Sequence, residues 1–73
     1  MLFQVKIKEI RCSCFFSQEE FAKEIGVSAM TITRWETGKS IPNYSARRKI
    51  NAFCQKYSID FDINKELMED NYA

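Results

Sequence analysis

The sequence predicts an all-α fold, and three observations carry that prediction. Serine and asparagine residues stand where helix N-caps are needed, and glycines follow two apolar segments where a helix would end. Apolar residues recur at intervals of three and four, which is the helical period. The chain has 73 residues, with six Phe, three Tyr and one Trp but only two Gly and one Pro. This length and composition predict a single folded domain rather than a disordered chain.

The first segment carries two periodicities. Phe3, Ile7, Ile10 and Cys14 fit one face of a helix over about residues 4–14, and a helix is the prediction for most of this segment. Apolar and polar residues also alternate strictly over residues 3–8 and again over 59–63, with lysines in the first stretch and aspartates in the second. A small antiparallel β pairing of these two segments is therefore an alternative. The residues after 64 are expected to form one more short helix or to fray.

The next helix is predicted over residues 18–25. Ser17 and Glu20 have the spacing of a capping box, in which the serine side chain accepts from a backbone N–H and the glutamate reaches back to the cap. Gly26 stands where a left-handed residue would end the helix. The apolar residues that this helix would bury are Phe21, Ala22 and Ile25.

A third helix is predicted over residues 29–36. Ser28 can cap its start, Gly38 supplies the next stop, and Pro42 forbids a simple continuation. Because two short helices joined by a tight turn cannot bury their faces alone, Ile32 and Trp35 are expected to pack on the flanking segments.

A fourth helix is predicted over residues 44–57, with Asn43 as its cap. One stripe of this helix is apolar and comprises Ala46, Ile50, Phe53, Cys54 and Tyr57. The opposite face holds Arg47, Arg48, Lys49 and Lys56. A solvated helix face is the favoured interpretation of the first three, with a DNA clamp as the alternative.

The net charge of +1 conceals two parts of opposite sign. Residues 1–57 hold ten Lys and Arg against five Asp and Glu, a net charge of +5, whereas residues 58–73 hold one Lys against five Asp and Glu, a net charge of −4. We therefore divide the chain into a basic domain, residues 1–57, and an acidic C-terminal tail, residues 58–73. Such a distribution permits a polyanionic partner.

Several function classes are disfavoured by what the sequence lacks. Histidine is absent, so the commonest general base and metal ligand is missing, and no cofactor, metal site or enzymatic activity is expected. Cys12, Cys14 and Cys54 are an odd number in a poor spacing for zinc, and reduced thiols are the expectation. No apolar run approaches the roughly 18 residues that span a bilayer, and no leader is evident, which predicts a small soluble cytoplasmic domain with no membrane partner.

The central motif is long enough to be specific. The chain resembles the phage-repressor/Cro-type (xenobiotic-response-element-like) helix-turn-helix family over about 27 continuous residues, through Phe16-Ser17-Gln18-Glu19-Glu20-Phe21-Ala22, Ile25-Gly26-Val27-Ser28, Thr31-Ile32, Arg34-Trp35-Glu36, Gly38-Lys39 and Pro42. The resemblance implies a compact bundle of four or five helices that binds double-stranded DNA, usually as a homodimer. In such a fold the helix over 29–36 would enter the major groove.

The same resemblance assigns candidate DNA-binding residues. Arg34 is the best candidate for a bidentate contact to guanine, whereas Ala29 and Met30 can offer only apolar contact. Thr33 is the alternative to Arg34 at the base-facing positions, and Gln18 would brace against phosphate or reach a base. The residues that would position the protein on phosphates are Ser17, Thr31, Thr37, Lys39 and the helix start at 43–45. The full set comprises Ser17, Gln18, Ser28, Ala29, Met30, Thr31, Thr33, Arg34, Thr37, Lys39, Asn43 and Tyr44.

Structural explanations compete with these assignments. Ser17 and Ser28 are sufficiently explained as caps, and Arg34 could pair with a neighbouring carboxylate instead of a base. Glu36 is predicted to be structural and to orient a donor such as Arg11 or Arg34. Phe15 stands where the family usually has glycine, and a bulky residue there would be strained, which leaves another ending of the first helix open.

The sequence therefore supports two hypotheses of different classes. The leading one is a sequence-specific DNA-binding regulator of transcription that represses by occupying an operator. The alternative is a protein-interaction module or antitoxin-like autoregulator, in which the same fold binds a protein partner, with the acidic tail making contact.

Overall fold

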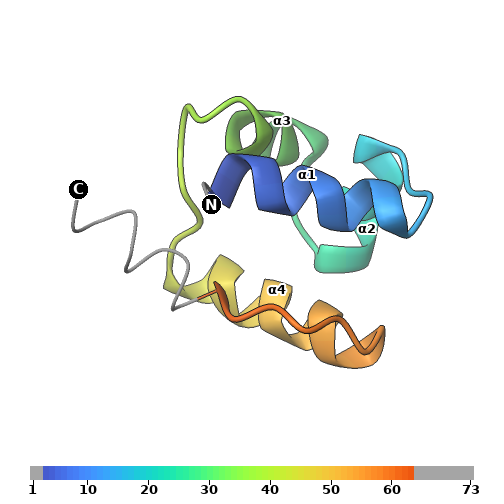
Figure 1. Cartoon of the computed structure of the whole chain (residues 1–73). Helices are drawn as coiled ribbons and strands as arrows, with labels where there is room; N and C mark the ends of the chain where they lie inside the picture. The colour runs from blue at the N-terminus through green and yellow to red at the C-terminus, as the bar shows by residue number, and fades with distance from the viewer. Residues whose placement is uncertain (1–2, 64–73) are drawn as a thin grey trace.

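The all-α prediction is confirmed by a computed structural model that describes residues 3–63. Its helices are α1 (Phe3–Ser13), α2 (Gln18–Ile25), α3 (Ala29–Glu36) and α4 (Tyr44–Lys56) (Figure 1). The strand alternative for residues 3–8 is wrong, because these residues form the start of α1, and no strand occurs within 3–63. The expectations for the residues after 64 lie outside the described part of the chain.

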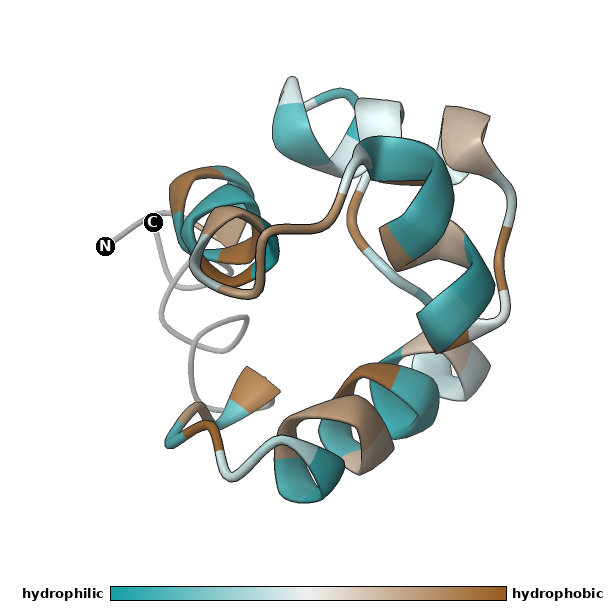
Figure 2. Ribbon diagram, turned by 90° about the vertical axis from the view of Figure 1, so that its right-hand side faces the viewer, coloured by the Kyte–Doolittle hydropathy of each residue, from teal (hydrophilic) through white to brown (hydrophobic). Residues whose placement is uncertain are grey.

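The core is built from the apolar faces predicted for the four helices. Helix α3 packs against both α1 and α2, and α2 also packs against α4. In Figure 2 the apolar segments of α4 turn toward the centre of the molecule. The buried apolar residues are Phe3, Ile7, Ile10, Phe21, Ala22, Ile25, Ile32, Trp35, Ala46, Ile50, Phe53, Cys54 and Ile63. Cys14 is only half-buried and Tyr57 is 38% exposed, so these two lie at the edge of the core.

The predicted caps are present at the starts of α2, α3 and α4. The Ser17 hydroxyl accepts from the Glu20 N–H at 3.1 Å, and the Glu20 carboxylate accepts from the Ser17 N–H at 2.9 Å, which completes the capping box. Ser28 accepts from the Thr31 N–H, and the Asn43 side chain accepts from the Ala46 N–H. Each cap satisfies a backbone donor that the helix itself leaves without a partner.

All four helices end in the same way. The residue after each last turn is left-handed, with φ of 60° at Phe15, 95° at Gly26, 75° at Gly38 and 56° at Ser58. The N–H of the following residue then bonds to the carbonyl five residues back, as from Phe16 to Arg11 at 3.2 Å. This is the Schellman arrangement, and glycine suits its left-handed position best. Gly26 and Gly38 were predicted helix stops, whereas Phe15 and Ser58 reach the same conformation with a side chain.

The segment after α4 packs back onto the molecule. Ile63 is 2% exposed, and Ile59 and Phe61 are half-buried against the core, while Asp60 and Asp62 are exposed. The alternation over 59–63 therefore separates core-facing from solvent-facing residues without any strand partner in residues 3–63. The division between a domain ending at 57 and a tail stays a prediction.

The cysteines are free and differ in environment. Cys12 is exposed, Cys14 is half-buried and Cys54 is buried, where desolvation raises the pKa of the Cys54 thiol to about 11. In residues 3–63 no three His, Cys, Asp or Glu side chains gather as a metal site would require. No helix in this part of the chain has the length and apolar character needed to cross a membrane.

Replacing Phe15 with glycine is expected to stabilise the protein by about 1 kcal/mol. The left-handed backbone is less favourable by about that amount for a residue with a Cβ than for glycine. Phe15 is 93% exposed, so little packing is lost. Urea and thermal unfolding measure the gain, expected as a rise in Tm of about 4–8 °C. The control is Phe15→Ala, which keeps the Cβ and should show no such gain. A Phe15→Gly variant no more stable than the parent would contradict this account.

Candidate nucleic-acid interface

Helices α2 and α3 are joined by the tight turn Gly26-Val27-Ser28. The turn is tied to α4 as well, because the Lys49 ammonium donates to the Gly26 carbonyl at 3.1 Å. Ser28 fixes the start of α3 by accepting from the Thr31 N–H, and its hydroxyl also lies 2.9 Å from the Thr31 hydroxyl. The start of α3 and the turn that precedes it are therefore fixed by hydrogen bonds.

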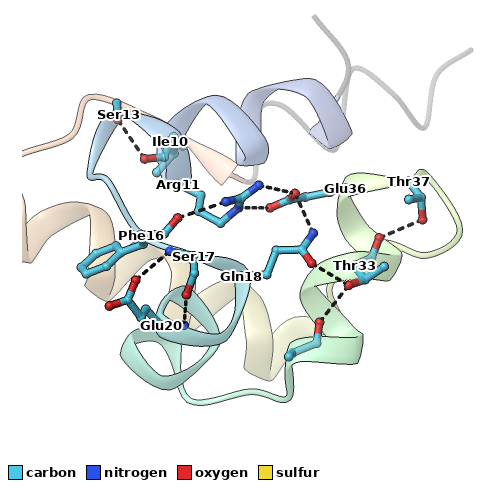
Figure 3. Close-up of polar contacts among 11 residues, drawn as sticks. Ile10, Arg11, Ser13, Phe16, Ser17, Gln18, Glu20, Thr33, Glu36 and Thr37 are labelled. Atoms are coloured by element: carbon cyan, nitrogen blue, oxygen red, sulfur yellow. Dashed lines mark hydrogen bonds and ion pairs between the residues drawn. The ribbon is translucent and has the colours of Figure 1, made fainter.

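The last turn of α3 is held by an ion pair with α1 (Figure 3). Arg11 donates from Nε to Glu36 Oε2 at 2.7 Å and from Nη2 to Glu36 Oε1 at 3.0 Å. The two side chains are only 13% and 4% exposed, and this hydrogen bonding raises the pKa of Arg11 above its ordinary value. Arg11 Nη1 also donates to the Phe16 carbonyl at 3.0 Å. The prediction that Glu36 orients a donor is confirmed, and that donor is Arg11.

Gln18 extends this network from α2 into α3. Its amide nitrogen donates to Glu36 Oε1 at 3.1 Å, and its amide oxygen accepts from the Thr33 hydroxyl at 3.1 Å (Figure 3). The Thr33 hydroxyl also lies 3.2 Å from the Ala29 carbonyl. Both ends of the Gln18 amide are thus occupied within the protein.

The outer face of α3 presents side chains that this network leaves unused. Met30, Arg34 and Thr37 follow one another at intervals of four and three residues, opposite the buried Ile32 and Trp35. Met30 is 64% exposed, and Arg34 is exposed with no hydrogen bond or ion pair from its guanidinium to another residue of the described chain. The Thr37 hydroxyl returns to the Thr33 carbonyl at 2.8 Å. The face therefore offers one long apolar group and one cation.

The start of α4 lies beside this face. A hollow between α3 and α4 is lined in part by Thr31, Arg34, Asn43, Ser45 and Lys49. The first turn of α4 has exposed side chains at Tyr44, 77% exposed, and at Ser45. Its backbone N–H groups and the nearby cations make this a favourable surface for an anion such as a phosphate.

The twelve predicted DNA-binding residues fall into three structural groups. The caps use their side chains within the helix start, and these are Ser17, Ser28 and Asn43. Others have side chains bonded inside the domain, and these are Gln18, Thr31, Thr33 and Thr37. The rest make no polar side-chain contact within residues 3–63, and these are Ala29, Met30, Arg34, Lys39 and Tyr44. Contact with DNA stays a prediction for all twelve.

The basic residues of α4 lie on a solvent-facing side of the helix as predicted, with Arg48 and Lys49 exposed and Arg47 half-buried. Arg47 Nε donates to the Pro42 carbonyl at 3.0 Å and Lys49 donates to Gly26, so two of the three cations brace loops beside the helix-turn-helix. Arg48 is exposed. Ile41, which lies three residues before the start of α4, is 50% exposed and was not predicted as a DNA-binding residue. The Lys49–Gly26 contact joins residues 23 positions apart, so no local signal in the sequence identifies it.

Comparison with known proteins agrees with this geometry. Residues 7–61 match the family described as helix-turn-helix. The chain is also similar to the HTH-type transcriptional activator BcrR of Enterococcus faecalis, with 32% identity over 62 residues. That match covers 85% of this chain and 29% of the relative, so the chain corresponds to less than a third of its length. No solved structure matches the chain significantly.

Proposed function

The chain belongs to the helix-turn-helix family, and from that premise we propose that it binds double-stranded DNA and regulates transcription. The observation that carries the proposal is the outer face of α3, where Met30 and Arg34 are exposed on a helix whose other faces are fixed by the core and the Glu36 network. A rigid helix with exposed side chains in its first turns fits the major groove, which is about 12 Å wide.

Phosphate contacts on either side of α3 would supply most of the affinity. The N-terminus of α4, which has no acidic residue in its first turn, presents backbone donors near the face, and Lys39 is exposed just after α3. Such groups attract phosphates without reading sequence, so they set the register in which α3 meets the bases.

The finer proposal is a homodimer that occupies an operator and blocks polymerase. Two copies would place their α3 helices about 34 Å apart, one turn of the duplex. The similar protein BcrR is named an activator, so a promoter–reporter assay in which the chain is supplied in trans distinguishes the two outcomes. Repression is the proposed result, and increased expression would replace it with activation.

The proposal is tested by titrating salt against binding to two duplexes, one of random sequence and one from upstream of the chain's own coding region. We expect tighter binding to the upstream duplex, with log affinity falling linearly as log salt rises, and the slope reports the number of phosphate contacts. Weak binding of both duplexes at about 50 mM salt would refute DNA binding.

The second candidate is a protein-interaction module that works through the acidic tail. It is favoured by the charge of residues 58–73, and it is separated from DNA binding by truncation. Because Ile63 is buried in the core, the truncation is made after residue 63. Loss of a protein partner with DNA binding intact would assign the two activities to different parts of the chain.

A further inference from the structure

We infer that Met30 is a specificity-determining residue that recognises the C5-methyl group of thymine, and that it acts beside a guanine contact from Arg34. This inference rests on the proposed function, since it concerns which bases the outer face of α3 selects. It is carried by hydrogen bonds within the protein, which occupy the other neutral polar side chains near this face.

The neutral polar side chains of α3 and of the adjoining start of α2 are engaged in hydrogen bonds within the protein. The Gln18 amide joins Glu36 to Thr33, and the Thr33 hydroxyl lies between Gln18 and the Ala29 carbonyl. The Thr31 hydroxyl is paired with Ser28. Releasing Gln18 or Thr33 toward a base would break bonds around the largely buried Glu36, so adenine recognition by an amide is disfavoured.

Met30 is then the most exposed side chain in the N-terminal half of α3. It is 64% exposed, unbranched and without a hydrogen-bond donor, and its neighbour Ala29 is half-buried. In the major groove the thymine methyl is the apolar group that a base pair presents. A methionine set against the cytosine amino group or the adenine amino group would instead remove a polar group from water without a partner.

Arg34 follows Met30 by four residues on the same face, about 6 Å along the helix axis. Base pairs rise by about 3.4 Å, so this spacing corresponds to roughly two steps of the duplex. The arrangement therefore predicts a half-site in which a thymine and a guanine lie about two base pairs apart.

The test begins with selection of bound sequences from a pool of randomised duplexes by the whole chain. The enriched duplex is then synthesised with deoxyuridine in place of single thymidines, which removes only the methyl group. At one thymidine in the half-site we expect binding to weaken by about 3- to 10-fold, the effect of losing a buried methyl contact. The Met30→Ala variant should bind the two duplexes equally, and Met30→Leu should keep the preference.

The outcomes separate this inference from the proposed function. Failure to enrich any sequence would overturn the Met30 inference and sequence-specific regulation, and the salt titration then shows whether non-specific DNA binding remains. An enriched sequence that binds equally well with deoxyuridine at every position would overturn the Met30 inference and leave DNA binding intact. A deoxyuridine penalty that persists in Met30→Ala would also overturn it, because another residue would then contact the methyl. Unchanged thermal unfolding of both Met30 variants controls for folding, as expected for an exposed side chain.

Discussion

Replacing Glu36 with alanine is expected to destabilise the protein by about 3 kcal/mol, because it leaves a largely buried guanidinium without its partner. Arg11 is 13% exposed and loses both hydrogen bonds to the carboxylate, and the Gln18 amide loses its acceptor as well. Domains of this size have only about 5–15 kcal/mol of stability, so the loss is a large fraction of the total. Urea unfolding followed by circular dichroism measures it.

Two variants show whether the effect comes from the unpaired charge. Glu24 pairs with Lys56 at 3.5 Å, but these side chains are 32% and 68% exposed, so Glu24→Ala should cause a much smaller loss. Joint replacement of Arg11 and Glu36 by Met and Leu removes the charge and should recover much of the lost stability. If Glu36→Ala proves as mild as Glu24→Ala, the network does not hold α1, α2 and α3 together as we describe.

The elements of this fold were predictable because their signals are local. The bounds of α2 and α3 follow from Ser17, Gly26 and Ser28, each of which acts on backbone groups within a few residues. Phe15 and Ser58 show the limit of such signals. They adopt the left-handed backbone that glycine favours, because the Schellman hydrogen bonds and the packing that follows impose it.

The candidate site was predictable only in part, because its geometry depends on distant residues. Arg11 and Glu36 are 25 positions apart, and their pairing was one of two alternatives for Glu36. The resemblance assigned Gln18 to DNA, and nothing local shows that its amide is engaged by Thr33 and Glu36. The packing of Ile63 against the core likewise depends on the return of the chain along α4.

The Arg34→Ala variant is expected to lose about 10- to 100-fold in affinity for the enriched duplex, because a bidentate contact to guanine is worth about 1–3 kcal/mol. Its guanidinium is free of ion pairs within residues 3–63 and lies one turn beyond Met30 on the outer face. Binding to random duplex should change far less, so the variant loses selectivity for the guanine position. Fluorescence anisotropy with both duplexes over a range of salt concentrations measures these changes.

Arg34 also borders the hollow beside α4, where a phosphate could bind instead, and the salt dependence distinguishes the two roles. Lys39→Ala is the matched control, because Lys39 is an exposed cation outside α3 and is expected to contact phosphate. This variant should weaken binding to both duplexes by a similar factor, and it should reduce the slope of log affinity against log salt by about one. Arg34→Lys keeps the charge but lacks the planar fork, so a base contact predicts that it fails to restore selectivity. Should Arg34→Ala behave as Lys39→Ala does, Arg34 is a phosphate contact and the guanine assignment is wrong.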